Sequence, residues 1–242
     1  MGGEQLGELG VAIEVEGLSI SYLEYHRSFS KPWGVSRNIE ALKEISMKID
    51  SGENFALIGR NGAGKSTFLR AVSGLVRPTS GRIRTKGRVV LLSGIDPGFI
   101  NTLSGKENLI ELGLAYGVKE NELVEFVSTV EEFAEIGEAI NRNVGGYSTG
   151  MRGKLGFGFI TSLKPDILLI DETLGVGDRV FREKAQRRLR EFIERSGTVI
   201  ISTHSLGLAK EICSTGILLE HGRLEAMGDV KEVVSRYVDI TQ

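Results

Sequence analysis

Residues 59–66, GRNGAGKS, constrain the fold of this chain more than any other stretch of its sequence. They match the pattern G-x-x-x-x-G-K-[ST], follow the apolar run FALI and precede the helix-like run TFLRAVSGL. Glycines let such a loop curl with its N–H groups turned inward, and the start of the next helix adds partial positive charge for phosphate oxygens. The succession of strand, glycine-rich loop and helix therefore predicts a nucleotide phosphate site in an α/β fold.

Two side chains at the end of this loop have separate expected roles. Lys65 would neutralise the β- and γ-phosphates, and the Ser66 hydroxyl would take a position on Mg²⁺. A chance match is the alternative, since the chain contains 32 glycines, but the strand before the loop and the helix after it argue against chance. The residues expected to contact nucleotide here are Gly59, Asn61, Gly62, Ala63, Gly64, Lys65, Ser66 and Thr67.

A second acidic anchor for a magnesium nucleotide follows the apolar run ILLI. Asp171 ends this run, where its carboxylate would reach the metal directly or through water. Glu172 comes next, where it would polarise the water that attacks the γ-phosphate. A solvated pair of acids at a strand end is the alternative, but the phosphate loop upstream favours the catalytic interpretation.

From about residue 100 to 162 the apolar residues take a helical spacing, clearest between positions 123 and 134. Near the end of this lobe lies the sequence YSTGM, residues 147–151. Ser148 and the N–H groups near Gly150 would donate to γ-phosphate oxygens at a helix start. A plain serine N-cap is the alternative. On a separate lobe, this second anion site would not reach the phosphate loop of its own chain.

The motifs follow one another in the order GRNGAGKST, YSTGM, ILLIDE, GVGD and the histidine of STHS. In this order, and over nearly its whole length, the chain resembles the nucleotide-binding subunits of ABC transporters. The resemblance implies an α/β fold with a P-loop NTPase core, an antiparallel β subdomain and an inserted α-helical signature subdomain. It implies one nucleotide-binding domain over residues 1–242, with the helical subdomain at about 100–162. YSTGM would be the signature loop, usually L-S-G-G-Q, which closes over ATP held by the other subunit of a head-to-tail homodimer.

Three further residues acquire expected roles from this resemblance. His204, after the strand TVIIS, would contact the γ-phosphate and position the attacking water; a satisfied histidine at a strand end is the alternative. Asp178 matches an aspartate that communicates across the dimer, and it would also suit a helix N-cap. Tyr22 matches the aromatic that stacks on adenine, although a lone aromatic is more often a packing residue and Tyr25 lies nearby.

The sequence departs from the family pattern at the loop that joins the core to the helical lobe. Relatives usually carry a glutamine there, which contacts Mg²⁺ and senses the membrane partner. The stretch VVLLSGIDPGFINTLSGKENL contains no glutamine. Ser93, Asp96 or a water would fill its place.

Four features point to a narrower group: the missing glutamine, the signature YSTGMRGKLGFG, the motif DETLGVGD and the long segment between Tyr22 and Ala41. In these features the sequence resembles ATPases that export capsular polysaccharide, O-antigen and wall teichoic acid. That resemblance implies ATP and Mg²⁺ as cofactors, a separate polytopic permease as partner, and a peripheral location at the cytoplasmic side of the cell membrane. The alternatives are an ABC ATPase for another substrate, a soluble ABC-type ATPase acting on nucleic acid or ribosomes, and a P-loop kinase. Soluble ABC-type ATPases carry either long coiled coils or two ATPase cassettes in one chain, and neither fits this sequence. A P-loop kinase would explain residues 59–66 but would give no function to YSTGM and His204.

The N-terminal region is predicted to be rich in strands. Val11 to Ile20 alternates as a half-buried strand does, and alternation resumes from Leu42 to Ile49. Between them, residues 23–39 read as a surface loop, because Pro32 and scattered charges interrupt the pattern. Such a loop would be solvated, or would touch the membrane interface or the partner.

Composition excludes several other classes of protein. A formal charge of −2 gives no general attraction to nucleic acid or to an anionic membrane. Cys213 is the one cysteine, so the chain has no internal disulfide and fits a reducing compartment as a soluble protein. The N-terminal sequence lacks the basic start and apolar run of a secretion signal, and no apolar run approaches the roughly 20 residues of a membrane span.

Overall fold

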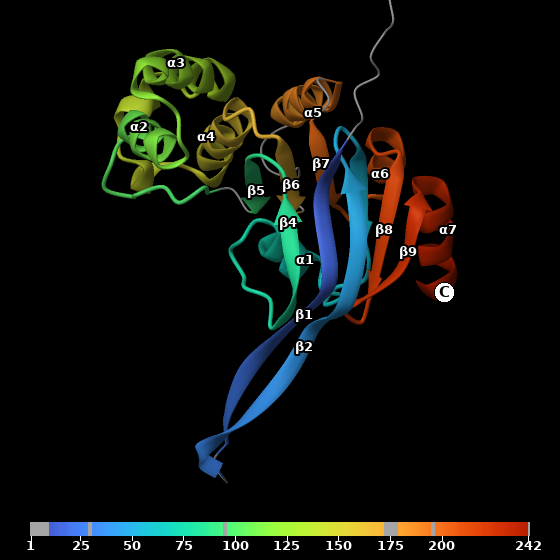
Figure 1. The fold of residues 1–242 in the computed structure, drawn as a ribbon. Coiled ribbons are helices and arrows are strands. Elements are labelled where there is room, and N and C mark those ends of the chain that lie inside the picture. The colour runs from blue at the N-terminus through green and yellow to red at the C-terminus, as the bar shows by residue number, and fades with distance from the viewer. Residues whose placement is uncertain (1–9, 29–30, 94–95, 172–178, 195–196, 242) are drawn as a thin grey trace, which may run out of the picture.

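The computed structural model describes residues 10–28, 31–93, 96–171, 179–194 and 197–241. Among these residues the strands form two sheets, one antiparallel with the order β2-β1-β4 and one with the order β5-β6-β7-β3-β8-β9 (Figure 1). The second sheet is parallel except where β9 pairs antiparallel with β8. The strands are β1 (Val11–Ser28), β2 (Lys31–Asp50), β3 (Asn54–Ile58), β4 (Ser80–Thr85), β5 (Val89–Ser93), β6 (Ile167–Asp171), β7 (Thr198–Ser202), β8 (Thr215–Glu220) and β9 (Arg223–Asp229).

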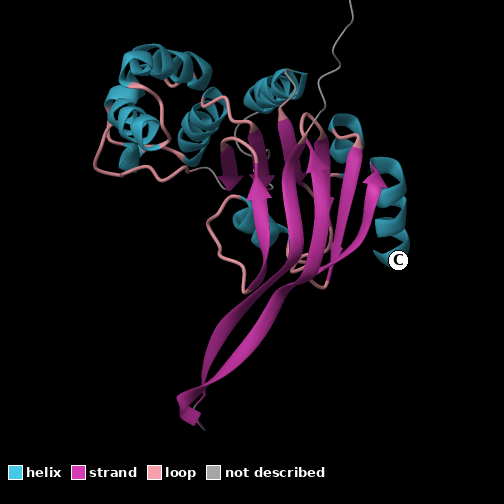
Figure 2. Cartoon of the chain, in the orientation of Figure 1, coloured by secondary structure: helices cyan, strands magenta, loops and turns pink. Residues whose placement is uncertain are grey.

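The helices fall into two groups. Three of them gather to one side of the sheets, and the others pack beside the strands (Figure 2). The lateral group is α2 (Gly105–Ala115), α3 (Leu123–Ala134) and α4 (Thr149–Ser162), joined by the short 3₁₀ turns Glu120–Glu122, Gly137–Asn141 and Val144–Gly146. The other group is α1 (Lys65–Val72), α5 (Arg179–Glu194), α6 (Leu206–Ile212) and α7 (Val230–Thr241). The predicted helical lobe at about residues 100–162 therefore corresponds to α2, α3 and α4.

The parallel sheet is buried on both faces. Alternate residues of each central strand belong to two different apolar clusters: in β3, Ala56 and Ile58 face one cluster while Phe55 and Leu57 face the other. Strands covered on both faces read as continuous apolar runs, which is why ILLI and TVII were recognisable in the sequence. The first cluster includes residues of α3, α4 and α5, and the second includes residues of α1 and the antiparallel sheet.

The lateral helices α2 and α4 begin at residues whose side chains satisfy free backbone N–H groups. Ser104 caps α2 in a capping box, because its Oγ accepts from the Glu107 N–H while the Glu107 carboxylate accepts from the Ser104 N–H at 2.7 Å. Ser148 caps α4 by a single bond, in which its Oγ accepts from the Met151 N–H. Within α3, the predicted apolar face is buried through Phe126, Val130 and their neighbours. Side-chain caps thus define the starts of α2 and α4, and buried residues of all three lateral helices belong to one apolar cluster.

The prediction of a surface loop over residues 23–39 is wrong. β1 and β2 continue as an antiparallel hairpin that projects away from the rest of the molecule (Figures 1 and 2), with pairs such as Leu23 with Asn38 and His26 with Val35. Leu23 is 64% exposed, so the hairpin extends past the core. Cross-strand backbone pairing does not require alternating apolar residues, and β2 is an edge strand that tolerates Pro32 near its start.

Two expectations from composition can be compared with the structure. Cys213 is buried, and burial raises the pKa of its thiol to about 12. It is therefore a small core residue rather than a reactive thiol. None of the helices among the described residues combines the length and apolarity that a bilayer crossing requires.

Candidate functional site

The phosphate loop occupies the turn between β3 and α1, and its backbone depends on glycine. Gly64 has a φ of 103°, in the left-handed region. A Cβ added there would lie 2.6 Å from Leu42 Cδ2 and 2.7 Å from the Ala41 carbonyl oxygen. A Cβ at Gly59 would overlap the carbonyl oxygen of Leu219. The loop is thus wedged between β2 and β8, at positions where only glycine fits.

Two hydrogen bonds fasten this loop to the strands beside it. The Gly222 N–H donates to the Ala63 carbonyl at 3.1 Å, and the Lys43 N–H donates to the Gly222 carbonyl at 2.7 Å. The turn between β8 and β9 therefore links β2 to the phosphate loop. This link holds the loop in position relative to both sheets.

Lys65 is buried, with only 7% of its surface exposed. Its ammonium group donates to the carbonyl oxygens of Gly59 and Arg60, at 2.7 and 3.1 Å, so it lies against the inside of the loop. A buried ammonium needs such partners, because an unpaired charge inside a protein is costly. The positive charge is therefore concentrated where the loop backbone curls.

Ser66 and Asp171, the two residues expected to hold Mg²⁺, lie together. The Ser66 hydroxyl donates to Asp171 Oδ1 at 3.1 Å, across 105 residues of sequence. Asp171 ends β6, and in the sheet it is in register with Ser93 of β5 and Ser202 of β7. Ser202 Oγ is buried and is without a hydrogen-bond partner among the described residues.

These side chains suit a magnesium ion. Mg²⁺ prefers oxygen ligands and is commonly bound by one or two carboxylates together with substrate phosphates and water. The hydroxyl of Ser66 and the carboxylate of Asp171 supply two such oxygens beside the phosphate loop. No group of three or more histidine, cysteine or acidic side chains that would hold a metal by itself occurs among the described residues.

The other predicted catalytic residues are placed in part. His204 is exposed and lies just past the end of β7, before Ser205, which caps α6. Because β3, β6 and β7 are parallel neighbours, their carboxyl ends bring His204, Asp171 and the phosphate loop to the same edge of the sheet. Glu172 and Asp178 lie outside the described residues.

Tyr22 lies in β1 beside Ile39 of β2, and 41% of its surface is exposed. Two residues earlier, Ile20 pairs with Leu42, the residue that packs against Gly64. Tyr22 is therefore on the strand paired with β2, which borders the phosphate loop, at the point where the projecting hairpin leaves the core. A large, exposed aromatic ring in this position is available for stacking.

The YSTGM segment forms the start of α4. Ser148 Oγ accepts from the Met151 N–H at 3.2 Å, and Ser148 itself is exposed. A Cβ added at Gly150 would meet only Ser148 Oγ, at 3.9 Å, so the space around it is open. Tyr147 anchors the segment: its hydroxyl donates to the Ala139 carbonyl at 2.6 Å, and burial raises the pKa of its phenol. The result is an accessible helix start on a fixed base.

The signature segment and the phosphate loop lie on different parts of the molecule. Figure 1 shows α4 within the lateral group of helices and α1, which begins at the phosphate loop, beneath the antiparallel sheet. The two helix starts expected to bind phosphate, Ser148 on one part and Gly64 on the other, thus lie apart.

Comparison with known proteins identifies the family to which this chain belongs. The family profile described as "ABC transporter" matches residues 42–175. The chain belongs to the ABC transporter family. As a member of it, the protein is an ATPase that binds ATP.

Similar ABC proteins share this sequence over most of its length. The "Teichoic acids export ATP-binding protein TagH" of Listeria innocua serovar 6a is 40% identical over 197 residues, which are 81% of this chain and 58% of the relative. The "O-antigen export system ATP-binding protein RfbB" of Klebsiella pneumoniae is 37% identical over 223 residues, 91% of this chain and 90% of the relative.

Solved structures share the ABC ATPase fold. An ATP-binding subunit of an ABC transporter superposes with a TM-score of 0.80 at 24% identity, covering 96% of this chain and all of the other. A dimeric, post-hydrolysis ATP-binding cassette bound to ADP and phosphate gives a TM-score of 0.73 at 21% identity, covering 90% of this chain and 98% of the other. The predicted fold class, with an antiparallel sheet and a helical subdomain on a P-loop core, is therefore confirmed.

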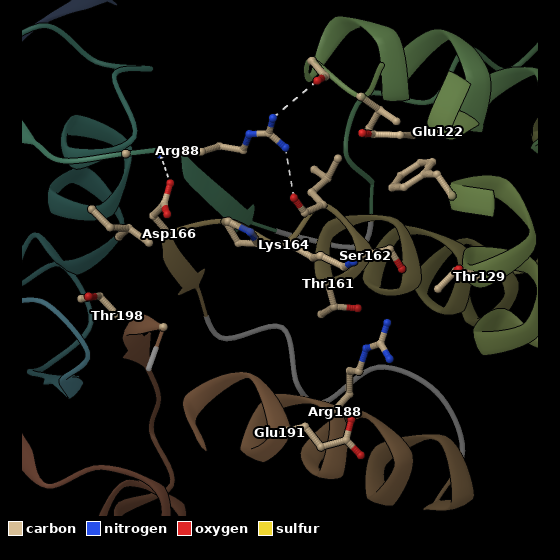
Figure 3. Close-up of a pocket in the computed structure, with 18 of the residues that line it drawn as sticks. Arg88, Glu122, Thr129, Thr161, Ser162, Lys164, Asp166, Arg188, Glu191 and Thr198 are labelled. Atoms are coloured by element: carbon tan, nitrogen blue, oxygen red, sulfur yellow. Dashed lines mark hydrogen bonds between the residues drawn. The ribbon is translucent and has the colours of Figure 1, made fainter. Parts of the chain in front are cut away.

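A cavity of about 1030 Å³ in this ABC protein lies away from the predicted site (Figure 3). It is lined by residues at the starts of the parallel strands, such as Asp166 and Thr198, and by the end of α4 at Ser162. Asp166 accepts there from the Arg88 N–H at 2.6 Å. The phosphate loop is at the opposite ends of those strands, and none of the predicted site residues lines the cavity.

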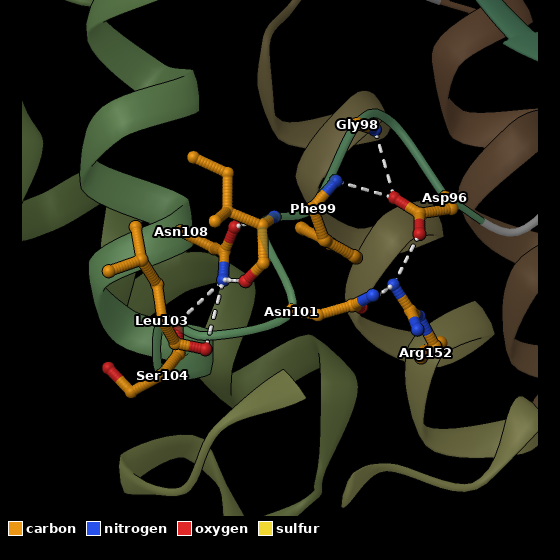
Figure 4. A network of polar contacts seen from close by, with 9 residues as sticks. Asp96, Gly98, Phe99, Asn101, Leu103, Ser104, Asn108 and Arg152 are labelled. Atoms are coloured by element: carbon orange, nitrogen blue, oxygen red, sulfur yellow. Dashed lines mark hydrogen bonds and ion pairs between the residues drawn. The ribbon is translucent and has the colours of Figure 1, made fainter. Parts of the chain in front are cut away.

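Sequence reasoning missed one feature beside the signature loop. Arg152, in the first turn of α4, forms an ion pair with Asp96 at 2.6 Å (Figure 4). Asp96 had been considered only as a substitute for the missing glutamine. Nothing in the sequence pattern signals a pair separated by 56 residues, whereas the adjacent capping box of Ser104 and Glu107 had a recognisable spacing.

Proposed function

We propose that this chain is the ATP-hydrolysing subunit of an exporter that moves a lipid-linked polysaccharide of the O-antigen, capsule or teichoic acid type outward through a separate membrane subunit. The observation that carries the proposal is the match to RfbB, which extends over 91% of this chain and 90% of that O-antigen export protein. The match to TagH points to the same class of cargo. Transport of another substrate by the same machinery is the alternative.

The chain forms one nucleotide-binding domain over residues 1–242. Its phosphate loop binds the phosphates through backbone N–H groups and Lys65, and Tyr22 stacks on the adenine. Ser66 and Asp171 hold Mg²⁺, and their observed proximity supports this role. When bound, Mg²⁺ neutralises charge that develops on the phosphate oxygens.

Hydrolysis uses residues at the carboxyl edge of the parallel sheet. Glu172 takes the proton from the attacking water, and His204 positions that water against the γ-phosphate. Ser93 would take the place of the missing glutamine beside the Mg²⁺ site. Its register beside Asp171 supports this choice, whereas both carboxylate oxygens of Asp96 are engaged within the helical subdomain.

Two chains associate head to tail, each completing the other's nucleotide site. The helical subdomain at about residues 100–162 presents Ser148 and Gly150 to the γ-phosphate held by the second chain, and Asp178 communicates across the contact. The exposure of Ser148 and the open space at Gly150 support this arrangement. Closure on two Mg-ATP passes a movement to the membrane subunit, and hydrolysis resets the open state.

The protein therefore works at the cytoplasmic side of the cell membrane, held there by a polytopic permease and without contact to nucleic acid. The relatives named as ATP-binding proteins of export systems support this location. The projecting β1–β2 hairpin and the helical subdomain are the parts available for contact with a partner.

The test is to reconstitute the chain in proteoliposomes with the membrane subunit encoded beside it. Lipid-linked polysaccharide from the same cells should stimulate phosphate release several-fold, whereas the lipid carrier alone should not. Glu172→Gln should bind ATP and reduce turnover by about 10²-fold or more, since the general base is lost.

Equal stimulation by the bare lipid carrier would contradict polysaccharide as the cargo. Turnover of Glu172→Gln at the parent rate would contradict the assignment of the base.

A further inference from the structure

Asp96 stands at the start of the segment that joins β5 to α2, and its carboxylate makes three hydrogen bonds (Figure 4). Oδ1 accepts from the N–H groups of Gly98 and Phe99, at 2.9 and 2.6 Å. Oδ2 accepts from Arg152 Nη2 at 2.6 Å. One oxygen thus shapes its own loop, while the other reaches a different element.

Arg152 belongs to the first turn of α4, four residues after Ser148. Its backbone N–H donates to the Ser148 carbonyl at 3.0 Å, so the two residues are joined through the helix. Its guanidinium group also donates to Asn101 Oδ1 at 2.9 Å, and 24% of the side chain is exposed. Arg152 therefore binds two side chains of residues 96–104, and charge-assisted bonds of this kind are stronger than neutral ones.

The same segment is bonded to the chain that precedes the signature loop. The Gly145 N–H donates to the Asn101 carbonyl at 3.0 Å, and the Val144 N–H donates to the Leu103 carbonyl at 2.9 Å. Residues 96–104 consequently hold YSTGM from both sides, through Val144 and Gly145 before it and through Arg152 after it.

Asn108 makes this segment rigid from within. It is fully buried, accepts from the Ile100 N–H at 2.7 Å, and donates to the carbonyls of Ile100 and Leu103. A buried amide with its hydrogen bonds satisfied fixes the loop around it. Asn108 therefore ties residues 100–104 together next to the start of α4.

We propose that Asp96 and Arg152 are positioning residues for the signature loop. Their ion pair sets the direction in which Ser148 and Gly150 face the nucleotide of a second chain. Neither residue touches that nucleotide. The inference rests on the proposed head-to-tail dimer and assigns to Asp96 a role different from that of a metal contact.

The test measures ATP-dependent dimerisation in the Glu172→Gln background, which arrests hydrolysis. Asp96→Asn keeps an oxygen for the Gly98 and Phe99 N–H groups but removes the charge that Arg152 binds. We expect the protein concentration for half-dimerisation in Mg-ATP to rise about tenfold by analytical ultracentrifugation. Binding of a fluorescent ATP analogue to the monomer should be unchanged, because the phosphate loop of the same chain is intact.

Arg152→Lys provides a second variant, since it keeps the charge but loses the geometry that spans Asp96 and Asn101. It should weaken dimerisation in the same direction. The double variant should need no higher protein concentration for half-dimerisation than the single variant with the larger defect, because the effects of two residues in one pair are not additive. Lys119→Gln is the control: it removes an exposed ion pair to Glu122 in the same group of helices and should change nothing.

Unchanged dimerisation of both single variants, or fully additive effects in the double variant, would overturn this inference alone. A Glu172→Gln parent that stays monomeric in Mg-ATP would overturn the proposed function and the inference with it.

Discussion

At the scale of single residues, Gly64 and Gly150 differ in how closely their surroundings confine them. Gly64 has a positive φ and is enclosed by Leu42 and the Ala41 carbonyl. Gly150 lies in the first turn of α4 with open space around it. Both belong to predicted nucleotide contacts, yet only the first is required by the fold.

These two glycines predict opposite effects on stability. Gly64→Ala should lower the free energy of unfolding by about 2 to 3 kcal/mol, because it adds backbone strain and a collision. Gly150→Ala should leave that free energy unchanged or raise it by up to about 1 kcal/mol, since alanine favours a helix. Urea unfolding of both variants and the parent measures the difference. A Gly64→Ala protein as stable as the parent would show that the loop is not held as described.

The sequence assigns Ser66 and Asp171 to one expected Mg²⁺ site, and the hydrogen bond between them agrees with that nearness. The sequence did not predict the contact of Arg152 with Asp96. An arginine on a helix is ordinarily solvated, and its partner is fixed by the path of the chain between residues 96 and 104, which no local spacing encodes. Residues in a motif with a shared expected ligand are thus easier to place from the sequence than two residues joined only by the path of the chain.

At the scale of elements, predictions succeeded where burial produces a pattern. β6 and β7 are covered on both faces, and α3 buries one face, so their apolar residues follow the expected spacing. The β1–β2 hairpin beyond Leu23 is stabilised by backbone pairing instead, which leaves no comparable pattern in the side chains. The sequence therefore does not predict the hairpin, because backbone pairing leaves no pattern of apolar residues to recognise.

The capping box of α2 makes a pH-dependent contribution. Hydrogen bonds from the Ser104 side chain and then from its backbone lower the pKa of Glu107. A carboxylate with a lowered folded pKa stabilises the fold fully above its unfolded value of about 4.3, and this contribution is lost as the pH falls through the folded pKa.

Glu107→Gln should therefore lower the urea midpoint at pH 7, and the gap from the parent should narrow as the pH falls below about 4.3. In a Ser104→Ala background the gap at pH 7 should shrink, because the hydroxyl partner is gone. Midpoints measured from pH 7 to 3.5 test this expectation. A gap independent of pH would show that the charge of Glu107 does not contribute.

At the scale of the whole molecule, the phosphate loop and the signature loop lie on separate parts of one chain (Figure 1). Each is suited to bind phosphate, and each is exposed toward other molecules. In the proposed head-to-tail dimer, a second copy supplies the phosphate contacts that one copy does not bring to its own nucleotide.

The mass of the Glu172→Gln protein in solution tests this account most directly. We predict that multi-angle light scattering gives the mass of one chain without nucleotide and twice that mass in Mg-ATP. Adding Ser148→Arg should keep the mass at one chain while a fluorescent ATP analogue still binds, since the phosphate loop is untouched. An ATP-bound Glu172→Gln protein that stays monomeric, or a Ser148→Arg protein that dimerises as its parent does, would contradict the account.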